Sequence, residues 1–102
     1  MIKTWPEKRP AEAVTVTFRF ARELPEGVTL APGATVQITT RKGADLVPQA
    51  MLAGSAAVSG TDVLARLMGG LDQVQYLVTC TADTSTGDRL QLEAILPVAN
   101  AR

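Results

Sequence analysis

The 102-residue chain has no histidine and one cysteine, Cys80. Without histidine it lacks the commonest general base and the commonest metal ligand, so Ser–His, Cys–His and histidine-ligated zinc sites cannot be built within one chain. A single cysteine cannot form an internal disulfide, which favours a reducing compartment or a particle assembled in one. Asp72, Asp83 and Asp88 form no D-x-D-x-D run for calcium, and Gly69–Gly70 lacks the pattern of a phosphate-binding loop. The sequence therefore predicts no catalytic residue, no cofactor and no metal site.

An excess of charge of one sign is also missing, because 10 Lys and Arg balance 10 Asp and Glu. Nucleic-acid binding would require a basic surplus to neutralise phosphates. No apolar run approaches the roughly 20 residues of a membrane span. The first ten residues, MIKTWPEKRP, are polar and interrupted by proline, unlike a signal peptide. We expect no nucleic-acid or membrane partner, and synthesis in a cytoplasm.

Aromatic residues make up 4% of the chain, and Phe18 and Phe20 alternate with polar residues as core residues do. Stacking platforms for sugars or bases need exposed aromatic side chains. With two of the four aromatics assigned to the core, the sequence predicts no such platform.

Short segments in which apolar and polar residues alternate are the main positive feature. The alternation predicts strands over 13–21, 34–40, 74–82 and 90–98, each with one apolar face. The last two flank DTSTGD, which is typical of a hairpin turn. Cys80 shares the inward face of 74–82, so we expect it to act as a small buried hydrophobe. Pro97 suggests that the last strand lies at a sheet edge.

The middle of the chain is harder to interpret. We expect one or two short strands near 50–53 and 56–58, whereas 61–68 fits either a short helix, which the pattern slightly favours, or a strand. The total is six to eight strands with frequent turn signals, which is typical of a small antiparallel β-sandwich. We expect this all-β domain to span 13–102, preceded by a polar N-terminal arm over 1–12.

Four residues are candidates for an interface. Trp5 either folds back over an end of the core or anchors the arm on a neighbouring subunit, since tryptophan is favoured at interface hot spots. Arg89 belongs either to a solvated face or to an ion pair with a partner. Thr84 and Ser85 lie in the hairpin turn, which we consider a further candidate contact surface.

Two blocks of the sequence together resemble a known family. FRFARELPEGVTL contains Leu24, Gly27, Thr29 and Leu30 of a strand–turn–strand motif. SGTDVLARLMGGLDQVQYLVTCTADTSTGDR contains a second motif, which includes Ser59, Gly60, Val63, Leu67, Gly69, Gly70, Tyr76, Val78, Thr84, Ser85, Gly87 and Arg89. Both resemble small immunoglobulin-like virion proteins of phages and prophages, described as fiber-tail adaptors or neck proteins. The chain departs from the family pattern at Phe18–Phe20, at Val74–Gln75 and at Asp88.

The resemblance implies a non-catalytic structural protein that joins components at the neck, tail or tail fiber of a virion. It implies other virion proteins as partners, possible assembly of several copies, and a location in the host cytoplasm and then in the virion. It also implies a strand over 61–68 and an immunoglobulin-like sandwich of about seven strands. The alternative is a bacterial immunoglobulin-like module that binds a protein or a carbohydrate, for which secretion and exposed aromatics would be expected.

Overall fold

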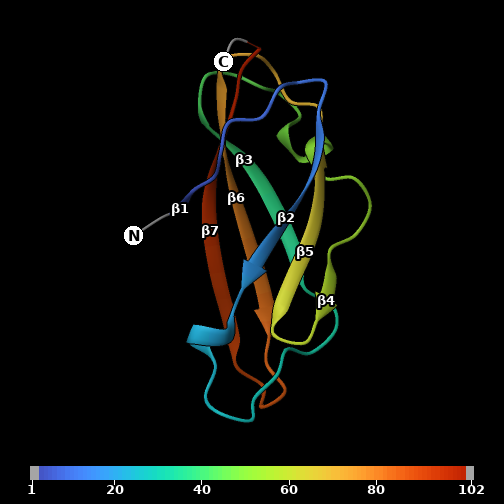
Figure 1. Cartoon of the computed structure of the whole chain (residues 1–102), viewed down its shortest axis with the longest axis vertical. Coiled ribbons are helices and arrows are strands. Elements are labelled where there is room, and N and C mark those ends of the chain that lie inside the picture. Colours follow the sequence, from blue (N-terminus) through green and yellow to red (C-terminus); the bar gives the residue numbers. More distant parts are fainter. Residues whose placement is uncertain (1–2, 101–102) are drawn as a thin grey trace.

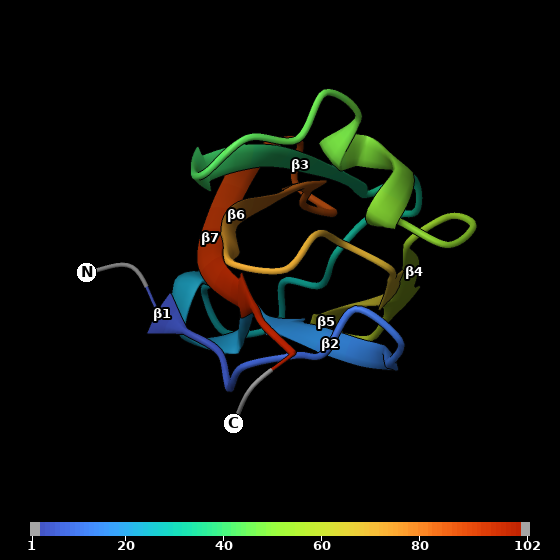
Figure 2. The same cartoon turned by 90° about the horizontal axis from the view of Figure 1, so that it is seen from above.

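Two sheets face each other in the computed structural model, which describes residues 3–100 (Figures 1 and 2). The first sheet has the order β1-β7-β6-β3 and the second the order β2-β5-β4. Their bounds are Lys3–Thr4 (β1), Ala13–Arg19 (β2), Thr35–Lys42 (β3), Ala57–Ser59 (β4), Asp62–Met68 (β5), Val74–Asp83 (β6) and Arg89–Val98 (β7). Every strand pair is antiparallel except β1–β7. The predicted immunoglobulin-like sandwich of about seven strands is confirmed.

The β6–β7 hairpin is the longest pairing and runs from Val74↔Val98 to Asp83↔Arg89. Alternate β6 residues are buried, as the sequence pattern predicts for a strand with one face on the core. Cys80 is fully buried on that face, and burial raises the pKa of its thiol to about 11. The prediction that Cys80 packs as a core residue is confirmed.

The ambiguous segment 61–68 forms a strand, as the resemblance implies and against the helical pattern. β5 pairs with β2 on one side and with β4 on the other. Its inward residues Val63, Ala65 and Leu67 are buried. Pairing on both sides stabilises the extended backbone, so tertiary contacts override the weak local preference.

Two local expectations are wrong. The strand expected near 50–53 is instead a 3-10 helix, Pro48–Met51, followed by a single bridge from Leu52 to Leu67. Short apolar runs do not distinguish these states by periodicity, and Pro48 suits the first turn of a helix. The last strand is not an edge strand, because β7 lies between β1 and β6, and beside Pro97 the Lys8 amide donates to the Pro97 carbonyl.

The N-terminal segment lies along β7. Beyond β1, the Trp5 amide donates to the Ile95 carbonyl at 2.9 Å and the Lys8 amide donates to the Pro97 carbonyl at 3.0 Å. Lys8 is 2% exposed, and its ammonium donates to the Gly69 carbonyl at 2.6 Å. Burial lowers the pKa of Lys8, and the nearby charge of Glu12 opposes that shift. β2 begins at residue 13, where the predicted domain begins, and the division into arm and domain stays a prediction.

Candidate docking surfaces

The sandwich is 44 Å long, so its two ends present separate surfaces. The turn between β6 and β7 lies at the lower end in Figure 1, beside the segment that connects β2 to β3. We call this the hairpin end. The loops at 43–47 and 69–73 lie at the opposite end, and we call that the loop end.

At the hairpin end, Thr84 is 5% exposed and organises the turn. Its amide donates to the Asp88 carbonyl at 2.7 Å, and its hydroxyl accepts from the Asp88 amide at 3.0 Å. Gly87, at φ 95°, closes the turn by donating its amide to the Thr84 carbonyl. These hydrogen bonds within the turn explain why position 84 is a threonine, without a contact to another protein.

Ser85 and Arg89 lie beside Thr84 and also have partners within the chain. The Ser85 amide donates to the Thr29 carbonyl at 2.8 Å, and the Ser85 hydroxyl accepts from the Thr29 amide at 3.3 Å. Arg89 Nε lies 2.9 Å from Asp83 Oδ1, and this ion pair raises the pKa of Arg89. The structure thus brings Thr84, Ser85 and Arg89 together, and their role as an interface stays a prediction.

Trp5 lies away from these three residues, on the side of the sandwich where β1 approaches β2. It is 9% exposed, and its ring meets that of Phe18 edge to face with centroids 5.2 Å apart. Such contacts belong to the core rather than to a free arm. This packing matches the interpretation in which Trp5 covers the core, while its role in contacts with a neighbour stays a prediction.

The loop end differs from the hairpin end, because its exposed side chains include several large apolar ones. Leu46 is 99% exposed and Val47 is 67% exposed, and the large hydrophobic residues Met68 and Leu71 are also exposed there. Val47, Met68 and Leu71 line one shallow depression. Single exposed apolar side chains are ordinary, but a group of them on adjoining loops is typical of an interaction site.

Tyr76, on β6, holds both loops of this end. Its side chain is buried, and its hydroxyl donates to Asp45 Oδ2 at 2.7 Å while accepting from the Leu71 amide at 2.9 Å. Burial, with the hydrogen bond to Asp45, raises the pKa of Tyr76 to about 12. Asp45 Oδ1 also accepts from the Val47 amide at 3.0 Å. The exposed apolar residues therefore stand on loops that a buried hydroxyl fixes from below.

Sequence reasoning missed the loop end. The strand was expected near 50–53, and the preceding residues Leu46 and Val47 carried no prediction. The signal that could have located the surface is the pair Leu46–Val47, which lies between Asp45 and Pro48. Those neighbours are typical of a turn, so an apolar pair between them is placed in solvent.

Within residues 3–100, no group of three or more His, Cys, Asp or Glu residues could hold a metal ion. No helix in the described part of the chain is long and apolar enough to span a membrane.

Comparison with known proteins gives the family. The family model described as "Podophage GP4 fiber-tail adaptor protein gp77" matches residues 8–97. The chain belongs to this family. No curated protein matches the sequence. The match includes both motif blocks, almost the whole sandwich and the loops of both ends, and it identifies the chain as a phage structural protein of the tail-adaptor type.

Proposed function

We propose that this family member is a non-catalytic joint that docks a neighbouring tail or fiber protein through its loop end. The observation that supports this proposal best is the group of exposed apolar residues Leu46, Val47 and Leu71 on loops that Tyr76 and Asp45 hold in place, with Met68 beside them at the end of β5. Preformed loops lose little conformational entropy on binding, which favours affinity. The proposed mechanism is assembly, and the family description names the components that an adaptor of this type joins.

Leu46 is the proposed anchor of this surface. Its side chain is 99% exposed in the isolated chain, and burying a leucine contributes about 2 kcal/mol. Val47 and Leu71, which line one depression at the same end, extend the apolar surface. An elongated domain that binds at one end leaves its other end free for a second component, which is the arrangement that a joint requires.

The test compares two aspartate substitutions in the intact protein. Leu46→Asp should remove the chain from purified virions while leaving its melting temperature nearly unchanged, because an exposed side chain contributes little to folding. Thr29→Asp, at an exposed position of the hairpin end whose hydrogen bonds to Ser85 come from its backbone, is the matched control. Quantitative mass spectrometry of particles gives the ratio of the chain to the other tail proteins, and the wild-type ratio reports the number of copies assembled.

Normal incorporation of Leu46→Asp would show that the loop end is not the docking surface. The complete absence of the wild-type chain from intact particles would refute the joint itself. The alternative of a carbohydrate-binding module has no comparable support, because Trp5, Phe18, Phe20 and Tyr76 are all buried.

A further inference from the structure

A sandwich of two open sheets has four edge strands, and three of them here are short or capped. β1 has two residues and β4 has three. β3 is longer, but the Gln49 side chain covers its free edge: the Gln49 amide nitrogen donates to the Val36 carbonyl at 2.9 Å, and the Ile38 amide donates to Gln49 Oε1 at 2.8 Å. A side-chain amide there occupies the place of a neighbouring strand's peptide group. Shortening and covering are the usual ways in which proteins prevent edge-to-edge pairing.

The remaining edge, β2, is long and uncovered. It has seven residues and pairs on one side only, with β5. The Phe20 amide donates to the Thr61 carbonyl at 3.0 Å, so even-numbered residues of this ladder face β5. The backbone N–H and C=O groups of Thr15, Thr17 and Arg19 therefore point away from the sheet. Among residues 3–100, these groups have no hydrogen-bond partner.

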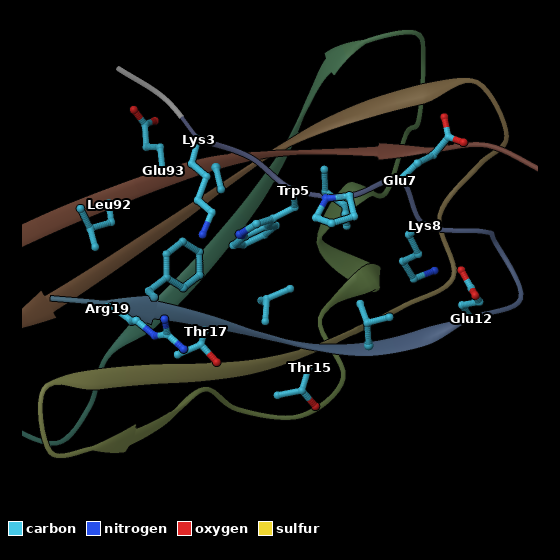
Figure 3. A pocket seen from close by; sticks show the side chains of 16 residues that line it. Lys3, Trp5, Glu7, Lys8, Glu12, Thr15, Thr17, Arg19, Leu92 and Glu93 are labelled. Atoms are coloured by element: carbon cyan, nitrogen blue, oxygen red, sulfur yellow. The ribbon is translucent and has the colours of Figure 1, made fainter. Parts of the chain in front are cut away.

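A groove of about 640 Å³ runs beside this free edge (Figure 3). Its apolar lining includes Trp5, Val16 and Phe18 on the core side and Leu92 from β7. Lys3 and Arg19 lie toward one end of the groove, which we call the basic end, whereas Lys8 and Glu12 lie toward the other. Neither Lys3 nor Arg19 makes an ion pair within the described residues. Glu93, which also lines the basic end, accepts a hydrogen bond from Thr79 at 3.2 Å.

We propose that β2 accepts an extended segment of a partner virion protein as an additional strand. The backbone groups of Thr15, Thr17 and Arg19 would complete its hydrogen-bond ladder, and its alternate apolar residues would lie over Trp5 and Phe18. An acidic residue of the segment would lie beside Lys3 and Arg19. A rigid surface elsewhere on a partner does not fit, since only an extended backbone matches the alternating donors and acceptors of a strand edge.

This inference concerns a second contact and rests on the proposed function for the kind of partner. It is independent of the loop end, which lies beyond the C-terminal end of β5 and contributes none of the groove residues named above. A partner held both by its folded surface at the loop end and by a flexible segment at β2 would bind through two linked contacts, which raises the effective affinity.

The probe is a set of overlapping synthetic peptides that cover the tail and fiber proteins encoded in the same phage genome. A peptide that binds the wild-type chain should protect the amides of Thr15, Thr17 and Arg19 from hydrogen exchange. Thr17→Pro removes one outward N–H, and a lost backbone hydrogen bond should weaken the peptide by about tenfold. Val58→Pro is the control, because its missing N–H lies on the opposite edge of the same sheet.

A substitution that changes the charge of a groove side chain gives a second test, and it leaves the backbone hydrogen-bonding groups of β2 intact. Arg19→Glu should weaken an acidic peptide severalfold and should reduce the salt dependence of its binding, because Lys3 is then the remaining cation at this end. The melting temperature of each variant shows whether it folds, and the exchange measurement on the wild-type chain does not depend on the variants.

Three results would overturn the proposal. One is that no peptide of the set binds; another is that a peptide binds but protects amides outside β2. The third is a dimer, detected by analytical sedimentation, that dissociates in the Thr17→Pro variant. Such a dimer would show that the edge of β2 pairs with a second copy of the chain. If these tests fail while Leu46→Asp still prevents incorporation into virions, the proposed function stands and the strand-addition site does not.

Discussion

The two ends of the sandwich differ in where their polar groups lie. At the hairpin end the polar side chains of Thr84, Ser85 and Arg89 lie at the tip and bind other parts of the same chain. At the loop end the polar bonds of Tyr76 lie below the surface, and apolar Leu46 stands above them in solvent. Polar residues in a turn are therefore poor evidence of an interface, whereas exposed apolar residues on fixed loops are strong evidence.

The largest effect is expected from Gly70→Ala at the loop end. Gly70 has φ 93°, and an added Cβ would lie 3.2 Å from both Met51 Cε and Val98 Cγ2. Strain of the backbone and overpacking should together reduce the free energy of unfolding by about 2–4 kcal/mol. Chemical denaturation measures this change.

Gly69→Ala is the matched control for Gly70→Ala. Gly69 has φ 73° but no atom within 4 Å of an added Cβ, so this variant should show the backbone cost alone. Equal losses in the two variants would mean that position 70 is not tightly packed.

Tyr76→Phe should have the next largest effect. It leaves the Leu71 amide and Asp45 Oδ2 without their shared hydroxyl, so we expect a loss of about 1–3 kcal/mol in the free energy of unfolding. Hydrogen exchange should accelerate at 43–47 and 69–73 but not at 84–88. Uniform acceleration over both ends would contradict the distinct anchoring of the loop end.

The pH dependence tests the same hydroxyl. The folded chain raises the pKa of Tyr76 from 10.0 to about 12, so the folded state retains its proton while the unfolded chain loses it. Stability from this group is complete below pH 10 and should fall as the pH rises toward 12. In denaturation curves at these pH values, the difference between wild type and Tyr76→Phe should shrink. A difference that stays constant would show that Tyr76 ionises normally.

A smaller effect is expected from Thr84→Val at the hairpin end. Valine keeps the shape but removes the hydroxyl that accepts from the Asp88 amide, and the loss should be about 1 kcal/mol because water can reach that amide. Thermal unfolding measures it, with Thr29→Val as control, because Thr29 is exposed at the same end and makes its hydrogen bonds to Ser85 through its backbone. A loss as large as that of Tyr76→Phe would remove the difference between the two ends.

The smallest effect is expected from Arg89→Ala. Its side chain is 73% exposed and that of Asp83 is 51% exposed, so water and salt screen the pair. The melting temperature should not change measurably. Reduced incorporation into virions at an unchanged melting temperature would support the interface role predicted for Arg89.

Much of the fold was predictable because its strands have one buried face. Alternation located β2, β3, β6 and β7, and the inward position of Cys80 followed from the same period. It failed near 50–53, where a 3-10 helix positions Gln49 against the edge of β3. Periodicity reports which face is buried, and it carries no information about a side chain that covers a sheet edge.

The candidate surfaces were less predictable than the strands. Trp5, Thr84, Ser85 and Arg89 were chosen by residue type, and the structure gives each of them a contact within the chain. The residue type of Leu46 is equally typical of a core position. Its exposure follows from the conformation of the loop, which contacts with distant residues decide.

By itself, the sequence determined the all-β character, the inward faces of the strands, the hairpin and the absence of histidine chemistry. These follow from residue type and from a period of two, which are local properties. Tertiary structure alone decided that β1 joins β7 in parallel, that Lys8 is buried and that Leu46 is exposed. It also decided that β2 is the edge left open, because the free side of a strand depends on which segments distant in sequence pack beside it.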